Sequence, residues 1–276
     1  MIELPEAVTL ARQLGQAIGG RRVVRVIANQ SPHRQAWFCG DPAAYAGLLE
    51  GTTADRVTSS GGCVQIALDG ARLVFAEGVV LRAQRAGERR PARHQLLLEW
   101  DDGAALCAAV QMYGGLWAYP EGAFESAYLS AAERAPSPLS EAFDRDYFAS
   151  ILGAPALQKL SAKALLATEQ RVPGLGNGVL QDILYAARIH PRRKVGTLDA
   201  GEREALFEAV RQTLGEMARH GGRDTERDLY GRPGGYRTRC SRRTFGTPCS
   251  RCASVIVKEA YLGGAVYFCP SCQGAG

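Results

Sequence analysis

The chain contains 276 residues, of which 46% are hydrophobic and 22% are charged, so it can form one large domain or two of about 150 residues and is too apolar for a disordered chain. Its 33 Lys and Arg residues against 28 Asp and Glu give a mild net charge of +5. No apolar run reaches the roughly 18 residues of a transmembrane helix. Glu3 and Glu6 stand where a secretory signal carries basic residues, which predicts a cytoplasmic protein without membrane association.

The first half of the chain predicts one helix followed by a β-rich region. Residues 5–18 carry apolar side chains at helical spacing, and Gly19 ends the pattern. From residue 22 to about 119, short apolar segments alternate with Gly, Asp and Pro; these segments are residues 23–27, 64–68, 73–75 and 95–100. Asp69–Gly70 and Asp102–Gly103 have the composition of turns between strands. This pattern predicts an antiparallel sandwich or barrel.

The second half predicts helices. The Pro- and Ser-rich residues 134–140 are typical of a linker. Beyond it, helical patterns cover residues 144–152, 155–168, 176–188 and 199–220. A loop rich in Gly and Arg follows from residue 221 to 235.

Positive charge is concentrated near the C-terminus. Residues 231–258 contain seven cations and no acid, which favours a polyanionic partner more strongly than the net charge does. A solvated basic loop is the alternative for this stretch alone.

Five of the eight cysteines fall in the last 37 residues. Four of them form two Cys-x2-Cys pairs separated by sixteen residues: Cys249, Cys252, Cys269 and Cys272. This spacing is typical of one structural zinc ion per chain, held by four thiolates at the ends of a hairpin. The predicted strands of that hairpin are residues 255–257 and 265–268. Cys240 lies outside the spacing and is predicted to be a free thiol.

A glycine-rich turn at residues 171–177 precedes one of the predicted helices. Such turns and helix N-termini present N–H groups to phosphates, although an ordinary connection between two helices has the same glycines. At this point the chain resembles the formamidopyrimidine-DNA glycosylase and endonuclease VIII family of base-excision repair enzymes. The resemblance rests on motifs that occur in the family's order over nearly the whole chain: residues 3–6, 138–140, 172–177, 189–191, 221–236 and the four cysteines.

This resemblance implies an α+β protein in three parts. Residues 1–133 would form a β-sandwich with a leading helix, residues 134–235 a helix–two-turn–helix module, and residues 236–276 a zinc finger. Damaged double-stranded DNA would lie between the two halves of a monomer associated with the nucleoid. Arg171 and Asn177 would contact DNA phosphates, together with the arginine-rich approach to the finger, which includes Arg239 and Arg242.

The N-terminus departs from the family pattern. The family attacks the sugar C1′ with an N-terminal proline that is exposed when Met1 is removed, but this chain has Ile2 there. A retained Met1 would place a primary amine about 3.5 Å away from the expected position. Glu3 occupies the position of the family's catalytic glutamate. Its carboxylate could transfer protons or activate water, or it could only favour the start of the first helix.

Other expected side chains are also missing. Gly62 stands at the position of a DNA-contacting lysine, and Gly264 replaces an arginine five residues before the third cysteine. Tyr113 and Gly114 fall where the family has the arginine and phenylalanine that fill the gap of a flipped base. Met112 and Tyr113 could wedge into that gap, or they could be core residues of a strand.

These residues are compatible with three functions. The first is a DNA N-glycosylase that depends on Glu3 and has weak or no lyase activity at abasic sites; Met1 and Ile2 would then supply only a primary amine. The second is a non-enzymatic protein that binds damaged DNA or a DNA structure on the same scaffold. The third, an unrelated zinc-ribbon regulator, leaves the ordered N-terminal and linker motifs unexplained. We favour the first.

Overall fold

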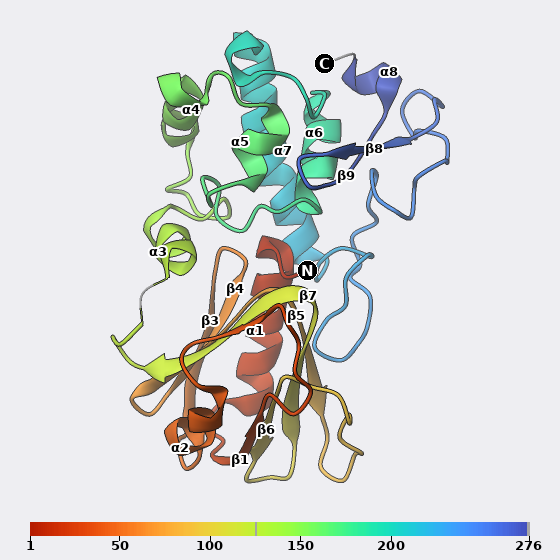
Figure 1. The fold of residues 1–276 in the computed structure, drawn as a ribbon. Coiled ribbons are helices and arrows are strands. Elements are labelled where there is room, and N and C mark those ends of the chain that lie inside the picture. The colour runs from red at the N-terminus through yellow and green to blue at the C-terminus, as the bar shows by residue number, and fades with distance from the viewer. Residues whose placement is uncertain (125, 275–276) are drawn as a thin grey trace. The chain divides into compact units, whose positions relative to one another are not determined.

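The computed structural model describes residues 1–124 and 126–274, and it divides into two compact units (Figure 1). Unit 1 comprises Met1–Leu129 and Glu226–Pro233, and unit 2 comprises Ser130–Thr225 and Gly234–Gly276. Within the described ranges, no helix has both the length and the apolar character needed to cross a membrane.

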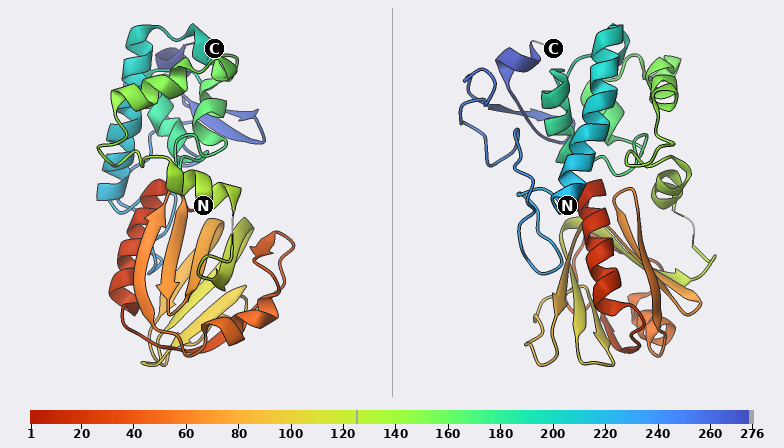
Figure 2. Two further views of the ribbon diagram at one scale, coloured as in Figure 1. Left: turned by 90° about the vertical axis from the view of Figure 1, so that its left-hand side faces the viewer. Right: turned by 180° about the vertical axis from the view of Figure 1, so that it is seen from behind.

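Unit 1 begins with helix α1 (Leu4–Ile18), which confirms the helix predicted at residues 5–18. Pro5 suits the first turn because its missing N–H has no helical partner there. The buried face includes Leu10 and Leu14, and this face packs on strands β3 (Ala54–Ser60) and β4 (Cys63–Leu68). Figure 2 shows α1 running along these two strands.

The sheet of unit 1 confirms the predicted antiparallel β-region. Its strands follow the order β1-β6-β7-β5-β4-β3, where β1 is Val23–Ala28, β5 is Ala71–Gln84, β6 is Leu96–Trp100 and β7 is Ala105–Pro120. The short strand β2 (Ala36–Phe38) pairs with β7 in parallel and leads through η1 (Pro42–Ala44) to α2 (Tyr45–Leu49). Asp69–Gly70 connects β4 to β5, as the sequence predicts.

A bulge divides the two longest strands of this sheet. In the β5–β7 ladder, Glu77 pairs with Gly114 but Val79 pairs with Val110, so the register shifts at this point. Glu77 has a φ of 62°, a left-handed conformation that is uncommon for a residue with a side chain. The bulge lies beside the N-terminus, because the Ile2 N–H donates to the Glu77 carbonyl oxygen at 2.6 Å.

Unit 2 is mainly helical. Helix α3 (Ala127–Arg134) crosses the boundary between the units, and α4 (Arg145–Gly153), α6 (Val179–Ala187) and α7 (Ala200–Arg219) follow the predicted helices closely. A short turn, η3 (Val195–Thr197), precedes α7. Asp199 and Glu202 form a reciprocal cap at the start of α7.

The helix predicted at residues 155–168 is wrong in its first half. The chain forms one 3-10 turn, η2 (Pro155–Leu157), and then helix α5 (Ala162–Ala167). The physical reason is Ser161, whose hydroxyl accepts the Ala164 N–H at 3.2 Å and starts a new helix.

The C-terminal segment forms the predicted hairpin. Strands β8 (Val257–Tyr261) and β9 (Gly264–Phe268) pair across a two-residue turn, and α8 (Pro270–Gln273) follows. The first strand therefore starts at the end of the predicted segment 255–257 and continues beyond it.

Candidate active site and nucleic-acid interface

The N-terminal residues are held in place by contacts within unit 1. The Met1 amine lies 2.6 Å from the Glu226 carboxylate and forms an ion pair with it. Ile2 is buried, and its N–H donates to Glu77 on β5. At the position for which the resemblance implies a nucleophile, this chain therefore has an amide nitrogen engaged in a hydrogen bond.

Glu3 is a buried carboxyl residue, with 3% of its surface exposed. It is the residue before α1, in extended conformation, and its side chain does not form a capping hydrogen bond to the helix. Its negative charge contributes to raising the pKa of Glu77, Tyr113 and Tyr128, although burial is the largest cause for each. Glu3 therefore belongs electrostatically to a cluster of acidic and phenolic groups.

Gly62 lies beside this cluster. A Cβ atom at Gly62 would be 3.0 Å from the Ile2 carbonyl oxygen, 3.3 Å from the Tyr128 hydroxyl and 3.7 Å from the Glu3 Cα. The Tyr128 hydroxyl also forms a hydrogen bond with the Glu77 side chain. The expected lysine position is therefore enclosed by the N-terminal backbone and by a tyrosine–glutamate pair.

The residues predicted to contact DNA near a flipped base, Met112 and Tyr113, lie with Gly114 at the β5–β7 bulge. A Cβ at Gly114 would be 2.7 Å from Val79 Cγ2 and 3.0 Å from the Val79 nitrogen, so the backbone leaves no room for a phenylalanine. Met112 is exposed over 65% of its surface, and the Tyr113 ring stacks on Trp37 at 5.5 Å. The described geometry thus places Met112 at the surface, and the prediction that these two residues contact DNA stays open.

In unit 2, the glycine turn places Arg171 and Asn177 beside α5 and the finger. The Arg171 guanidinium donates to the Thr168 hydroxyl at 2.6 Å and pairs with Glu169. The Asn177 amide donates to the Ala265 carbonyl oxygen at 2.8 Å. Asn177 therefore links the turn to hairpin β8–β9, whatever contact it makes with a ligand.

Lys163, which the sequence interpretation missed, lies beside the finger. It is 4% exposed, its ammonium donates to the Tyr261 carbonyl oxygen, and burial lowers its pKa. A Cβ at Gly264 would lie 3.4 Å from the Asn177 amide nitrogen and 3.5 Å from the Lys163 Nζ. Gly264, where the resemblance implies an arginine, is thus lined by two other hydrogen-bond donors, the Asn177 amide and the Lys163 ammonium. The only sequence signal for Lys163 was its place as a single lysine in the mostly apolar segment 160–167.

The arginine-rich approach to the finger is organised by Asp182. This buried carboxylate accepts the N–H groups of Arg239 and Cys240 at 2.8 and 2.7 Å. Burial raises the Asp182 pKa to about 6, against the lowering effect of these bonds. The Arg239 and Arg242 side chains are exposed, and the Arg242 guanidinium donates to the Thr225 carbonyl oxygen at 3.1 Å.

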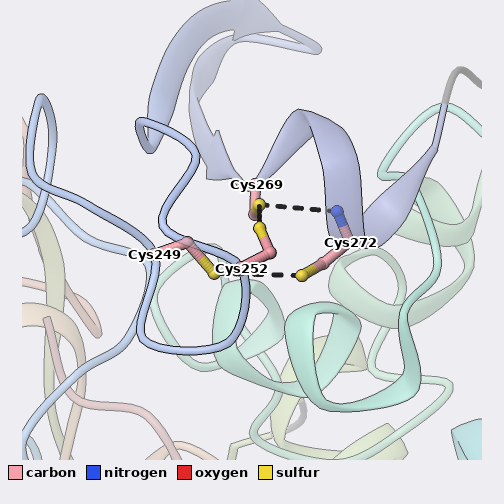
Figure 3. Close-up of side chains that lie close together, drawn as sticks. All are labelled: Cys249, Cys252, Cys269 and Cys272. Atoms are coloured by element: carbon pink, nitrogen blue, oxygen red, sulfur yellow. Dashed lines mark hydrogen bonds between the residues drawn. The ribbon is translucent and has the colours of Figure 1, made fainter.

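The four predicted cysteines meet at one point (Figure 3), with sulfur atoms within 4.8 Å of one another. Cys252 and Cys269 are separated by 3.4 Å, and Cys249 and Cys272 by 3.9 Å. The Tyr185 hydroxyl on α6 is 3.2 Å from the Cys249 sulfur. Cys240 is buried nearby but does not join the group. Four converging sulfurs are a donor set that can hold one metal ion.

Comparisons with known proteins agree with this architecture. A family model described as the formamidopyrimidine-DNA glycosylase H2TH domain matches residues 135–228. The formamidopyrimidine-DNA glycosylase of Symbiobacterium thermophilum is 32% identical over 99% of this chain and 89% of its own length. The chain belongs to the formamidopyrimidine-DNA glycosylase family. The enzyme of that name from Thermus thermophilus is 30% identical over the whole of both chains.

Solved structures of formamidopyrimidine-DNA glycosylases share the fold. The MutM (Fpg) protein of Thermus thermophilus has 27% identity and a TM-score of 0.81, with 99% of both chains covered. The Lactococcus lactis Fpg, solved in a complex with DNA that contains an abasic site, has a TM-score of 0.83 at 23% identity over 99% of this chain and all of that one. The resemblance inferred from the sequence motifs is confirmed.

Proposed function

We propose that this member of the formamidopyrimidine-DNA glycosylase family binds damaged double-stranded DNA and releases a modified base by hydrolysis, with little or no strand cleavage at abasic sites. The observation that supports this proposal is the arrangement of the first three residues. Ile2 supplies an amide that is already bonded to Glu77, whereas the adjacent Glu3 keeps a buried carboxylate. The Met1 amine is paired with Glu226.

In this mechanism Glu3 activates water. Its carboxylate accepts a proton from a water molecule that attacks the sugar C1′, and the bond from C1′ to the base breaks. This route needs no Schiff base, so it tolerates the loss of the N-terminal proline. An amine route needs an unprotonated amine within bonding reach of C1′, and the paired Met1 ammonium does not offer one.

We further propose that the monomer holds DNA through residues of both units. Arg171, Asn177, Arg239 and Arg242 would contact phosphates, which position a duplex without reading its sequence. Met112 and Tyr113 would contact bases near the lesion, because an exposed thioether and a partly exposed ring can stack where a base has been displaced.

The metal of the cysteine group is proposed to be zinc. A Zn–S bond of about 2.3 Å in a tetrahedron separates the sulfurs by about 3.8 Å, close to the two separations of 3.4 and 3.9 Å. Four thiolates fill the coordination shell, so the ion would supply folding energy to the finger and take no part in the reaction.

The test is base release from a panel of lesion-containing duplexes, measured by mass spectrometry of the freed base for the natural protein and Glu3→Gln. We expect release by the natural protein and loss of at least 100-fold in the variant. Release that survives Glu3→Gln removes Glu3 from the mechanism. Tight lesion binding without release by either protein replaces the proposal with a non-enzymatic damaged-DNA binding protein.

A further inference from the structure

A second carboxyl group lies in the cluster around Glu3. Glu77 accepts the Ile2 N–H through its backbone at 2.6 Å, and it keeps a left-handed φ of 62° at the bulge opposite Gly114. A residue with a side chain in this conformation is strained, and such strain persists where the surrounding structure imposes it, often at functional sites. The bulge thus fixes Glu77 beside the N-terminal segment.

The Glu77 side chain has a specific partner. It forms a hydrogen bond with the Tyr128 hydroxyl, which in turn lies 3.3 Å from the position of a Cβ at Gly62. The Glu3 Cα lies 3.7 Å from the same position. Tyr128 and Glu3 therefore flank the position of a Cβ atom at Gly62. Glu77 is connected to this position by its hydrogen bond to Tyr128.

We propose that Glu77 is a second acid–base residue for base release, which donates a proton to the departing base while Glu3 activates water. The inference rests on the proposed glycosylase function. Two carboxyl groups in one cluster but in different surroundings are the arrangement that acid–base cleavage of a glycosidic bond requires.

A water oxygen forms a bond to C1′, and the electron pair of the C1′–N bond leaves with the base. The base takes the proton of the Glu77 carboxyl, and Glu3 takes a proton from the water. The products are a neutral free base and an abasic sugar, with Glu77 ionised and Glu3 protonated; one proton transfer through solvent restores both groups.

The surroundings of Glu77 favour the protonated form. Burial is the largest cause that raises its pKa, and the charge of Glu3 adds to it; the Tyr128 hydrogen bond and the Met1 amine act in the opposite direction. Burial raises the pKa of Tyr113 on β7, and the charge of Glu77 adds to this effect. The Met1 amine in turn pairs with the Glu226 carboxylate.

The experiment is single-turnover base release from pH 5 to 9, on a duplex with a neutral ring-opened purine and on one with 7-methylguanine. Glu77→Gln should lower the rate on the neutral lesion by 100-fold or more and remove the loss of rate at alkaline pH. The cationic base leaves as a neutral molecule without an added proton, so its release should change less than 10-fold.

Tyr128→Phe separates a catalytic role from a structural one. Without the hydroxyl that stabilises the Glu77 carboxylate, the Glu77 pKa rises, so the alkaline limb on the neutral lesion should move to higher pH. A residue that only supports the fold would not move this limb. Glu121→Gln, an exposed glutamate paired with Arg72, is the control and should match the natural protein.

The outcomes separate the two proposals. If the natural protein releases base but Glu77→Gln keeps its rate and pH profile on the neutral lesion, Glu77 has no acid–base role and the Glu3 mechanism stands. If Glu77→Gln does not fold, an unshifted limb in Tyr128→Phe overturns the proposal. If the natural protein releases no base, both proposals are wrong.

Discussion

The α-amine of Met1 is paired with the carboxylate of Glu226, which is 225 residues away in the sequence and 2.6 Å away in the fold. The paired ammonium has no lone pair with which to attack a sugar carbon. The loss of the N-terminal proline is therefore accompanied by a contact that occupies the remaining amine.

The first prediction is that borohydride traps little or no covalent complex with an abasic duplex. Glu226→Gln removes the carboxylate that holds the Met1 amine in an ion pair, so trapping through this amine should increase several-fold over the natural protein. Denaturing gel electrophoresis of the trapped complex measures both. Efficient trapping by the natural protein, located at Met1 by peptide mapping, would contradict the proposed absence of lyase activity.

The second prediction concerns the metal. The purified protein should contain one zinc per chain, and Cys269→Ser should lose it and increase amide hydrogen exchange across β8 and β9, because the ion supplies folding energy. Cys240→Ser is the matched control and should keep the zinc, since Cys240 lies outside the sulfur group. Elemental analysis checks the metal, and a zinc-free natural protein would refute the assignment.

The third prediction concerns DNA phosphates. Arg171→Ala should weaken binding of all duplex sequences equally and reduce the slope of log K against log salt by about 1. Asn177→Ala should also weaken binding, in part because it removes the bond to Ala265 in the finger hairpin. Arg145→Ala serves as control, as this side chain pairs with Glu204 and Glu208 on α7. Fluorescence anisotropy at several salt concentrations measures the slopes, and unchanged slopes would place the phosphate contacts elsewhere.

The fourth prediction concerns the bulge. Gly114→Ala should lower the free energy of unfolding by about 1–3 kcal/mol, because the new Cβ would approach Val79 Cγ2 at 2.7 Å. Gly47→Ala in α2 has nothing within 4 Å of its Cβ and should stabilise by about 0.5–1 kcal/mol. Urea unfolding compares the two. Equal stabilities would show that the strands at Gly114 move apart without cost.

The fifth prediction is a pH dependence of stability at Asp182. Burial raises its pKa to about 6 from about 3.9 in the unfolded chain, so the folded state binds the proton more tightly. This contribution is complete below pH 4 and is lost as the pH rises through 6, with a total of about 3 kcal/mol. The natural protein should therefore gain stability relative to Asp182→Asn as the pH falls from 7 to 4.5. Effects of acid on the metal site occur in both proteins and cancel in the difference, so a constant difference would contradict the raised pKa.

Local sequence patterns predicted the fold well. The α+β class, α1, the turn at Asp69–Gly70 and the convergence of the four cysteines are confirmed, because helical periodicity, turn composition and Cys-x2-Cys spacing are local signals. The long strands β5 and β7 were only partly predicted, because Gly78 and Gly114 have the composition of chain breaks although both lie within strands.

The candidate site was harder to predict because it depends on distant pairing. Glu77 contacts Ile2 through a backbone hydrogen bond between β5 and the N-terminal segment. Glu226 pairs with Met1 although the two residues are far apart in the sequence. Nothing next to these residues in the sequence marks them. The roles of Glu3, Arg171 and Asn177 stay predictions until the variants are measured.

The return of Glu226–Pro233 to unit 1 has a practical consequence for work with fragments. Leu229 is fully buried in the core of that unit, its carbonyl oxygen accepts the Ala83 N–H at 3.0 Å, and Arg82 donates to the Asp228 carbonyl oxygen at 2.9 Å. A fragment cut after residue 129 would therefore lack the buried Leu229 side chain and leave the Ala83 N–H without its acceptor. Expression of the N-terminal sheet on its own should require this eight-residue segment to be joined back by a linker.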